Sequence, residues 1–182
     1  TISQKAWHVS SILDNLLNID NVDSPDQIIL NKDKYSIAEI LKHIVECTAN
    51  AGTSHEVKLD IQDQGVELNI DIKRVKRIFC HLLSNASKFS DNGSLISVRG
   101  RVEKDQYLFE IEDQGIGISE DNLEKVFDKF FRVDSSNTAR EGIGLGMNVV
   151  KTLIEAHGGD IKINSQINRG TTILFSFPLF ES

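Results

Sequence analysis

The sequence contains little proline, little cysteine and no long hydrophobic run. Two prolines and two cysteines occur among its 182 residues. No apolar stretch approaches the roughly 20 residues that span a bilayer, and no signal peptide is visible, so we expect no membrane contact by this chain. Basic residues are also in deficit, with 20 Lys and Arg against 27 Asp and Glu and a net charge of −7. This balance argues against a nucleic-acid-binding surface, because phosphate backbones attract an excess of Lys and Arg.

The two cysteines, Cys47 and Cys80, both fall within apolar stretches that have helical spacing. We interpret them as reduced core residues of a cytoplasmic protein rather than as a disulfide or a metal-binding pair. Hydrophobic residues make up 40% of the chain and charged residues 26%, which is typical of a globular domain with one sizeable core. Because residue 1 is Thr rather than Met, we expect a piece of a longer protein, whose other parts can include membrane segments.

Residues 1–24 carry a single apolar stripe of an amphipathic helix. Its members recur three or four residues apart, at Val9, Ile12, Leu16, Ile19 and Val22. The stripe has no partner of equal length nearby, so we expect it to pack against another helix or a second chain, and the parent protein to form a homodimer through it. Residues 25–35 are mostly polar and begin at Pro25, which predicts a linker. The remainder, 36–182, is expected to form one domain.

Residues 36–182 alternate between helical and strand-like patterns. Ser36 followed by Glu39 is a capping box, and Asp71 is a favourable N-cap. Apolar spacing predicts helices over 36–51, 71–89, 120–126 and 145–156, and strands around 57–61, 96–102, 107–111, 161–163 and 173–177. The expected fold class is α+β, with one mainly antiparallel sheet covered by helices and an N-terminal helix before it.

One ridge of the helix predicted over 71–89 carries polar residues suited to a metal–phosphate group. His81, Asn85 and Lys88 lie four and three residues apart, so they share a face of that helix. An Asn side-chain oxygen is a hard, neutral ligand for Mg²⁺, which takes its other ligands from water and phosphate. A Lys one turn further on can contact a phosphate as a point charge. Taken alone, the pattern is more typical of a solvated helix face, where Asn and Lys are common.

A carboxylate stands at the end of a predicted strand, directly before a glycine turn. Asp113 is followed by Gly115 and Gly117. An ionised carboxylate accepts hydrogen bonds only, so a buried Asp would pair with the amino group of adenine and reject the carbonyl of guanine. The two glycines would let the backbone approach a ligand closely. Taken alone, the motif also fits an ordinary turn.

A second glycine turn leads directly into the helix predicted over 145–156. Gly142, Gly144 and Gly146 precede or begin this helix, where backbone amides and the helix N-terminus favour phosphate. The spacing is G-x-G-x-G, and it follows no strand, so a Rossmann site is disfavoured. The P-loop pattern is absent from the sequence as well. By itself, this turn is weak support for a nucleotide site.

Four segments together resemble the N, G1, F and G2 boxes of sensor histidine kinases, in the order of that family. They are HLLSNASKFS at 81–90, DQGIG at 113–117, FDKFFR at 127–132 and GIGLGM at 142–147. The similarity covers about residues 36–180, and residues 1–24 resemble the second helix of the dimerisation domain of these kinases. The resemblance implies the Bergerat ATP-binding fold, a two-layer α/β sandwich with a mixed sheet.

The same resemblance implies a role for each site residue, with ATP and Mg²⁺ as cofactors. Asn85 would bind Mg²⁺, Lys88 would contact phosphate, and Asp113 would recognise adenine in a pocket shaped by Gly115 and Gly117. Phe127, Phe130 and residues 132–141 would form a lid over ATP, and Arg132 would reach the terminal phosphate. The hinge of the lid and the phosphate cradle would be formed by Gly142, Gly144, Leu145 and Gly146. Thr171 would support the adenine side of the pocket.

The implied activity is transfer of the γ-phosphate of ATP to a histidine on a dimerisation helix outside this chain, with a response regulator as a further partner. Two departures bear on it. His81 stands where these kinases usually carry a second Asn, and His8 is followed by Val9 rather than by an acidic residue, so His8 is not expected to be the phosphoacceptor. The alternatives are a regulatory pseudokinase module and a gyrase-type hydrolysing ATPase, which would use a Glu at the place of His81.

Overall fold

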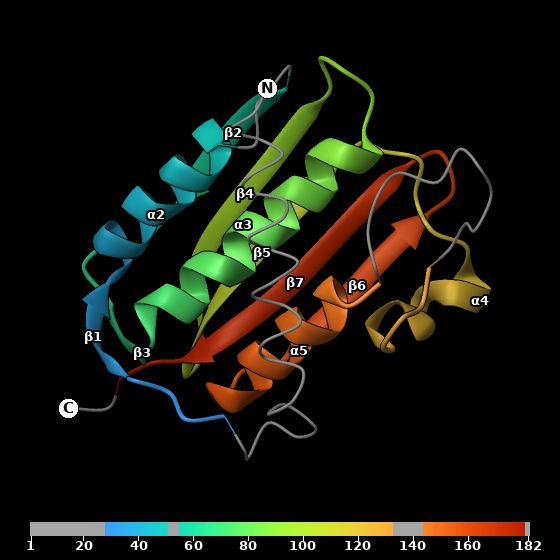
Figure 1. Ribbon diagram of the computed structural model, residues 1–182. Coiled ribbons are helices and arrows are strands. Elements are labelled where there is room, and N and C mark those ends of the chain that lie inside the picture. Colours follow the sequence, from blue (N-terminus) through green and yellow to red (C-terminus); the bar gives the residue numbers. More distant parts are fainter. Residues whose placement is uncertain (1–27, 51–54, 133–143, 181–182) are drawn as a thin grey trace.

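The computed structural model describes residues 28–50, 55–132 and 144–180, which form two layers. Three helices lie side by side across one face of a five-stranded sheet (Figure 1). They are α2 (Ile37–Asn50), α3 (Ile72–Phe89) and α5 (Gly146–Ala156). The strands are β2 (Glu56–Ile61), β4 (Leu95–Glu103), β5 (Gln106–Asp113), β6 (Ile161–Gln166) and β7 (Gly170–Pro178). The predicted two-layer α/β sandwich is confirmed.

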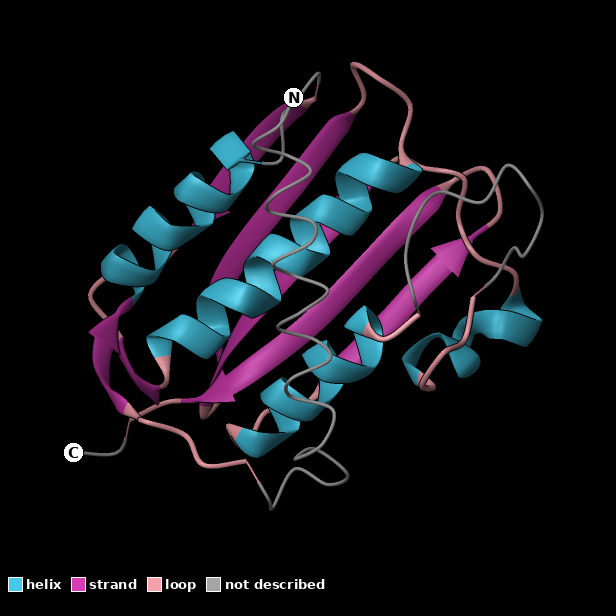
Figure 2. Ribbon diagram, in the orientation of Figure 1, coloured by secondary structure: helices cyan, strands magenta, loops and turns pink. Residues whose placement is uncertain are grey.

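The sheet is mixed, with strand order β2-β4-β5-β7-β6. β2 and β4 run parallel, and the other three neighbouring pairs run antiparallel. The helix layer covers the same face of all these strands (Figure 2). Within the described ranges, no helix combines the length and the apolar character needed to cross a membrane.

A second, two-stranded sheet lies at the end of the sandwich where α2 begins. It pairs β1 (Asp33–Ser36) with β3 (Glu67–Ile70) in antiparallel register. The predicted linker therefore ends in a strand, and β3 was not predicted at all. β3 has four residues, of which Leu68 and Ile70 are buried, and so short an alternation gives little periodic signal. The helix predicted over 1–24 lies outside the described residues and stays a prediction.

Both predicted helix starts are confirmed by their capping hydrogen bonds. Ser36 N donates to Glu39 Oε2 at 2.8 Å, and Glu39 N donates back to Ser36 Oγ at 3.3 Å. The carboxylate of Asp71 accepts from the backbone amides of Lys73 and Arg74, both at 3.1 Å. These bonds satisfy amide groups that the first turn of a helix leaves without partners.

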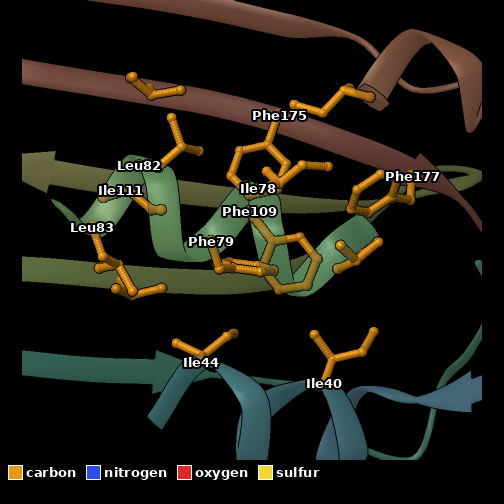
Figure 3. Packing of buried hydrophobic residues seen from close by; sticks show 14 of the residues in the cluster. Ile40, Ile44, Ile78, Phe79, Leu82, Leu83, Phe109, Ile111, Phe175 and Phe177 are labelled. Atoms are coloured by element: carbon orange, nitrogen blue, oxygen red, sulfur yellow. The ribbon is translucent and has the colours of Figure 1, made fainter. Parts of the chain in front are cut away.

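Aromatic rings fill the space between α3 and the middle of the sheet (Figure 3). Phe79 of α3 lies edge-on to Phe109 of β5 and to Phe175 of β7, with ring centroids 5.0 and 5.3 Å apart. All three rings are buried, as are Tyr107 and Phe177 on the same strands. Such pairs add about 0.5–1.5 kcal/mol each to the burial of apolar area. The cluster fixes α3 against β5 and β7.

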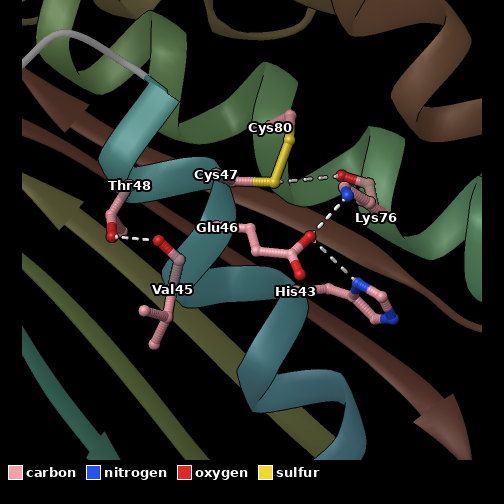
Figure 4. The surroundings of a disulfide bond; sticks show 7 residues. All are labelled: His43, Val45, Glu46, Cys47, Thr48, Lys76 and Cys80. Atoms are coloured by element: carbon pink, nitrogen blue, oxygen red, sulfur yellow. Dashed lines mark hydrogen bonds and ion pairs between the residues drawn. A yellow bond between two sulfur atoms is a disulfide. The ribbon is translucent and has the colours of Figure 1, made fainter.

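The two cysteines form a disulfide between α2 and α3, so their interpretation as reduced core residues was wrong (Figure 4). The Cα atoms of Cys47 and Cys80 lie 4.9 Å apart, and 33 residues separate them in sequence. The apolar pattern correctly placed Cys47 in the interior, where it is 2% exposed. It could not show that the two helices face each other at these positions. An ion pair of 2.6 Å between Glu46 and Lys76 joins the same helices.

His157 is a buried, neutral link between the end of α5 and the start of α3. Its Nδ1 donates to Leu153 O at 2.7 Å, and its Nε2 accepts from Asp71 N at 3.0 Å. Both bonds require the tautomer with its proton on Nδ1. Burial lowers the pKa of His157, although its bond to the Leu153 carbonyl acts in the opposite direction.

We therefore expect the free energy of unfolding to fall as the pH drops below 6.5. In that range the unfolded chain binds a proton at residue 157 that the folded chain binds less readily, so acid favours the unfolded state. Urea denaturation at pH 7.5 and pH 5.5 measures the loss. A His157→Gln variant should lose less stability between these two pH values than the wild type does. An equal loss in both proteins would contradict the role assigned to His157.

Candidate functional site

Three structural elements bring the predicted site residues to one end of the sandwich. The C-terminal end of α3, the N-terminal end of α5 and the short helix α4 (Glu120–Leu123) lie toward the same end (Figure 1). β5 ends beside α3, because Ile116 N donates to Phe89 O at 3.1 Å just after that strand. α4 continues into a 3-10 turn, η2 (Lys125–Phe127), so the helix predicted over 120–126 is present in two pieces.

Asp113 ends β5, and two backbone amides hold its carboxylate. Gly115 N donates to Asp113 Oδ1 at 2.8 Å, and Thr171 N donates to the same oxygen at 3.2 Å. Thr171 reaches this position because β7 pairs with β5 in a register that places it opposite Asp113. Both amides bind the same carboxylate oxygen. The carboxylate is thus fixed through one oxygen and can offer the other to a donor.

Burial raises the pKa of Asp113, while the hydrogen bonds from Gly115 and Thr171 and the neighbouring hydroxyl of Ser90 lower it. The Ser90 hydroxyl is buried and makes no hydrogen bond of normal geometry among the described residues. A buried hydroxyl in this state is costly unless a ligand supplies a well-placed partner. A nucleobase that presents both a hydrogen-bond donor and an acceptor could pair with the Asp113 carboxylate and the Ser90 hydroxyl together.

The glycines after Asp113 are required by close backbone contacts. A Cβ atom on Gly115 would lie 2.4 Å from Phe89 O, and one on Gly117 would lie 2.0 Å from Gln166 O. Gly117 also has φ +68, which side-chain-bearing residues rarely adopt. The turn therefore packs tightly between the end of α3 and the β6–β7 connection. Its backbone position, and so the shape of any pocket beside it, is fixed.

Asn85 points from α3 toward the start of α5. Its Nδ2 lies 3.1 Å from His81 Nε2 and 3.4 Å from Met147 Sδ. Burial, together with the nearby cations Arg77 and Lys88, lowers the pKa of His81 to about 4. His81 is therefore neutral at physiological pH, and Nε2 can accept the hydrogen bond from the Asn85 amide. The predicted metal ligand and the second glycine turn are brought together.

The N-terminus of α5 offers backbone amides without a capping side chain. Leu145 occupies the N-cap position, is buried and makes no side-chain cap bond. The first turn of the helix also contains no acidic residue. An uncapped helix N-terminus attracts anions through its amide groups and its dipole. Among the described residues, no group of three or more His, Cys, Asp and Glu could hold a metal, so a cation here would depend on Asn85 and on oxygens of a bound phosphate.

Gly146 is the first residue of α5, and it lies against the ring of His81. A Cβ atom at position 146 would stand 1.9 Å from Cε1 of that ring and 2.1 Å from Nε2. We expect Gly146→Ala to lower the free energy of unfolding by about 1–3 kcal/mol, because the added methyl group overpacks the contact. The loss, measured by urea denaturation, should shrink in a His81→Ala background, where the ring is absent. Equal losses in both backgrounds would mean that the ring and the methyl group do not collide.

The F and G2 segments are joined by a backbone hydrogen bond. Phe130 N donates to Gly144 O at 2.9 Å, and Gly144 has φ +78. Phe130 itself has φ 65 and is 64% exposed, an unusual conformation for a bulky residue. Phe127 instead packs against the core, and its carbonyl accepts from Asn148 Nδ2 at 3.0 Å. The two aromatic residues predicted for the lid thus differ, since one is anchored and the other is exposed.

The remaining predicted residues lie around these two groups. Lys88 is half-buried, with its Nζ 5.2 Å from the centre of the Phe89 ring. Arg132 is exposed at the edge of the described chain, whereas Gly142 and residues 133–141 lie outside it. The structure therefore places Asp113, Gly115, Gly117 and Thr171 together, and Asn85, Gly144, Leu145 and Gly146 together.

Sequence reasoning missed two residues of the site. Ser90 gave no signal beyond its place at the end of α3, and Met147 was included only as the last letter of a glycine-rich segment. Both act through contacts between elements that lie far apart in the sequence, since 62 residues separate Met147 from Asn85. Only the way α3 packs on α5 and β5 could have revealed them.

Known proteins share both this sequence and this fold. Residues 70–181 match the family described as "Histidine kinase-, DNA gyrase B-, and HSP90-like ATPase". The chain is 33% identical over 168 residues to the sensor protein KdpD of Clostridium acetobutylicum, and 32% identical over 174 residues to the sensor histidine kinase WalK of Bacillus subtilis strain 168. These matches cover 92% and 93% of the chain but 19% and 28% of the two relatives. The chain thus spans less than a third of the length of either relative.

A solved structure of the mycobacterial sensor histidine kinase MprB has the same arrangement of helices and strands. It superposes with a TM-score of 0.72 at 24% sequence identity. The superposition covers 82% of the present chain and 100% of that one. The similarity supports the two-layer sandwich.

Proposed function

Because the chain belongs to the family of histidine kinase-, DNA gyrase B- and HSP90-like ATPases, we propose that it binds Mg-ATP and transfers the γ-phosphate to a histidine on a dimerisation helix outside the chain. It would be the catalytic domain of a two-component sensor histidine kinase. The observation that carries the proposal is the half-buried carboxylate of Asp113, held through Oδ1 by two backbone amides. That arrangement directs one acceptor oxygen toward a ligand.

Recognition of adenine follows from the chemistry of this carboxylate. Oδ2 of Asp113 accepts from the exocyclic amino group of adenine, while guanine would present a carbonyl oxygen there and leave two acceptors opposed. The hydroxyl of Ser90, which is buried beside Asp113, can meet a ring nitrogen of the base. Gly115, Gly117 and Thr171 support the pocket through their backbone positions.

The phosphates occupy the other half of the site, between α3 and α5. The amides at the start of α5, with Gly144 and Gly146 beside them, donate hydrogen bonds to the phosphate oxygens, and Lys88 and Arg132 supply positive charge. The donor set fits Mg²⁺, because the Asn85 oxygen is one hard ligand and the phosphates provide others. When bound, the metal ion neutralises charge on the phosphates. Phe127, Phe130 and the segment that contains Gly142 would cover the nucleotide.

In phosphoryl transfer the protein mainly positions the reactants and neutralises charge. The acceptor imidazole is nucleophilic when neutral, so its nitrogen attacks the γ-phosphorus as the bond to the β–γ bridging oxygen breaks, and ADP leaves. Partners in the same proposal are a second copy of the parent protein, joined through the N-terminal helix, and a response regulator. The proposal places this domain in the cytoplasm, where ATP is available.

The contact between His81 and Asn85 argues against a gyrase-type hydrolase. Such an enzyme needs a free base one turn before the metal-binding Asn, to activate water. Here Nε2 of His81 lies 3.1 Å from the Asn85 amide nitrogen and, with the ring proton on Nδ1, accepts a hydrogen bond from it.

Calorimetric titration with Mg-ATP and Mg-GTP, together with a steady-state assay of ADP release, tests the proposal. We expect binding of ATP, much weaker binding of GTP, and little ADP release until a helix carrying the acceptor histidine is added. The product on that helix should be acid-labile, as a phosphoramidate is. Rapid ADP release without any acceptor would favour a hydrolase, and failure to bind ATP would favour a pseudokinase module.

A further inference from the structure

His81 and Asn85 form a contact that sets which way the Asn85 amide faces. The amide nitrogen has two neighbours, His81 Nε2 at 3.1 Å and Met147 Sδ at 3.4 Å. A thioether sulfur can accept a hydrogen bond but cannot donate one, so the contact with Met147 requires the amide nitrogen on this side. The bond to His81 then requires the tautomer that leaves Nε2 without a proton. The nitrogen therefore faces them, and Oδ1 is directed away.

The ring of His81 is itself held in place by α5. Its Cε1 and Nε2 lie so near Gly146 that a Cβ atom there would be 1.9 and 2.1 Å from them. The ring is therefore confined between its own helix and the first residue of α5. An acceptor confined in this way restricts the amide of Asn85 more than a mobile side chain would.

Confinement matters because an Asn side chain has two chemically different ends. If the amide turned by 180°, it would present NH₂ protons to a cation instead of an oxygen lone pair, and that orientation cannot ligate Mg²⁺. Neighbours that hold a ligand in its binding orientation raise metal affinity, and their removal typically lowers it about 10- to 100-fold.

We propose that His81 is a positioning residue that holds the Asn85 amide with its oxygen toward the Mg²⁺ of the bound nucleotide. This inference rests on the proposed function, in which Asn85 is a ligand of that ion. It gives a role to the residue at which the chain departs from the asparagine usual in sensor histidine kinases.

Calorimetry measures the affinity for ATP once with Mg²⁺ present and once with EDTA. The ratio of these two affinities isolates the contribution of the metal ion. We expect His81→Leu, which removes the acceptor but keeps a similar volume, to lower that ratio about tenfold and to leave the affinity in EDTA nearly unchanged. His81→Gln places an acceptor oxygen where Nε2 stands, so it should retain most of the ratio. If His81→Leu keeps the wild-type ratio, the proposal fails.

Two controls separate this inference from the function on which it rests. Asn85→Ala should remove the effect of Mg²⁺ on ATP affinity. If Asn85→Ala lowers the ratio while His81→Leu does not, the positioning role fails and the proposed function stands. If neither variant changes the ratio, the assignment of Asn85 to the metal ion fails as well.

A measurement on the unmodified 182-residue chain does not depend on whether the variants fold. Nitrogen-15 NMR of the imidazole reports which ring nitrogen carries the proton. We expect the ring proton of His81 on Nδ1, with a bare Nε2 that accepts a hydrogen bond. A proton on Nε2 would overturn the proposal, because that nitrogen could not then accept from Asn85.

Discussion

Asp113→Asn will weaken ATP binding by about tenfold or more, because a hydrogen bond to a charged group contributes roughly 1.5–3 kcal/mol. In the variant, Oδ1 can keep its bonds from Gly115 and Thr171, which places the new NH₂ group where Oδ2 stood. Two donors then face each other, since adenine also presents an amino group there. Calorimetry with ATP measures the loss, and the preference for ATP over GTP should shrink with it.

Glu112→Gln provides a matched control for the change in charge. Glu112 neighbours Asp113 on β5, and its Oε2 lies 2.7 Å from Arg99 Nη2. Successive side chains of a strand point to opposite faces, so the Glu112 carboxylate does not share the pocket. We expect ATP affinity within about twofold of the wild type, since the Glu112 carboxylate is partly exposed and paired with Arg99, and water screens such charges. Unchanged affinity in Asp113→Asn would remove the assignment of the adenine pocket.

Reduction of the disulfide will lower the free energy of unfolding by about 3–4 kcal/mol. Cys47 and Cys80 are 33 residues apart, so their bond restricts a long loop in the unfolded chain. The melting temperature should fall by roughly 10 °C. Urea and thermal denaturation with and without dithiothreitol measure the change.

A double variant, Cys47→Ser with Cys80→Ser, is the control for this second prediction. It should be less stable than the oxidised wild type, and dithiothreitol should not change its stability further. Two titratable thiols in the chain purified without reductant, or equal stability of the oxidised and reduced forms, would contradict the bond between α2 and α3.

The parts of the fold that depend on local chemistry were predictable from the sequence. The capping residues Ser36 and Asp71 are where they were expected, and the apolar stripe of α3 faces the sheet. The strands with long alternating patterns, β4, β5 and β7, were predicted as well. Each of these features is fixed by residues only a few positions apart, which is the range that periodicity and capping describe.

The parts that depend on distant pairings could not be predicted. The cysteines share no pattern with one another, and whether they bond depends on how α2 lies against α3. Thr171 was expected on the adenine side from family resemblance alone, and its contact depends on the register of β7 against β5. The closeness of His81 to Gly146 arises in the same way, from the packing of α5 on α3. The motifs thus indicate the kind of site, while its geometry depends on tertiary contacts.

A crystal structure of the chain with a non-hydrolysable ATP analogue and Mg²⁺ tests the central claim most directly. The adenine amino group should lie within hydrogen-bonding distance of Asp113 Oδ2, and the metal ion should contact Asn85 Oδ1, with the phosphates at the start of α5. A base bound away from Asp113, or phosphates bound away from α5, would contradict the account.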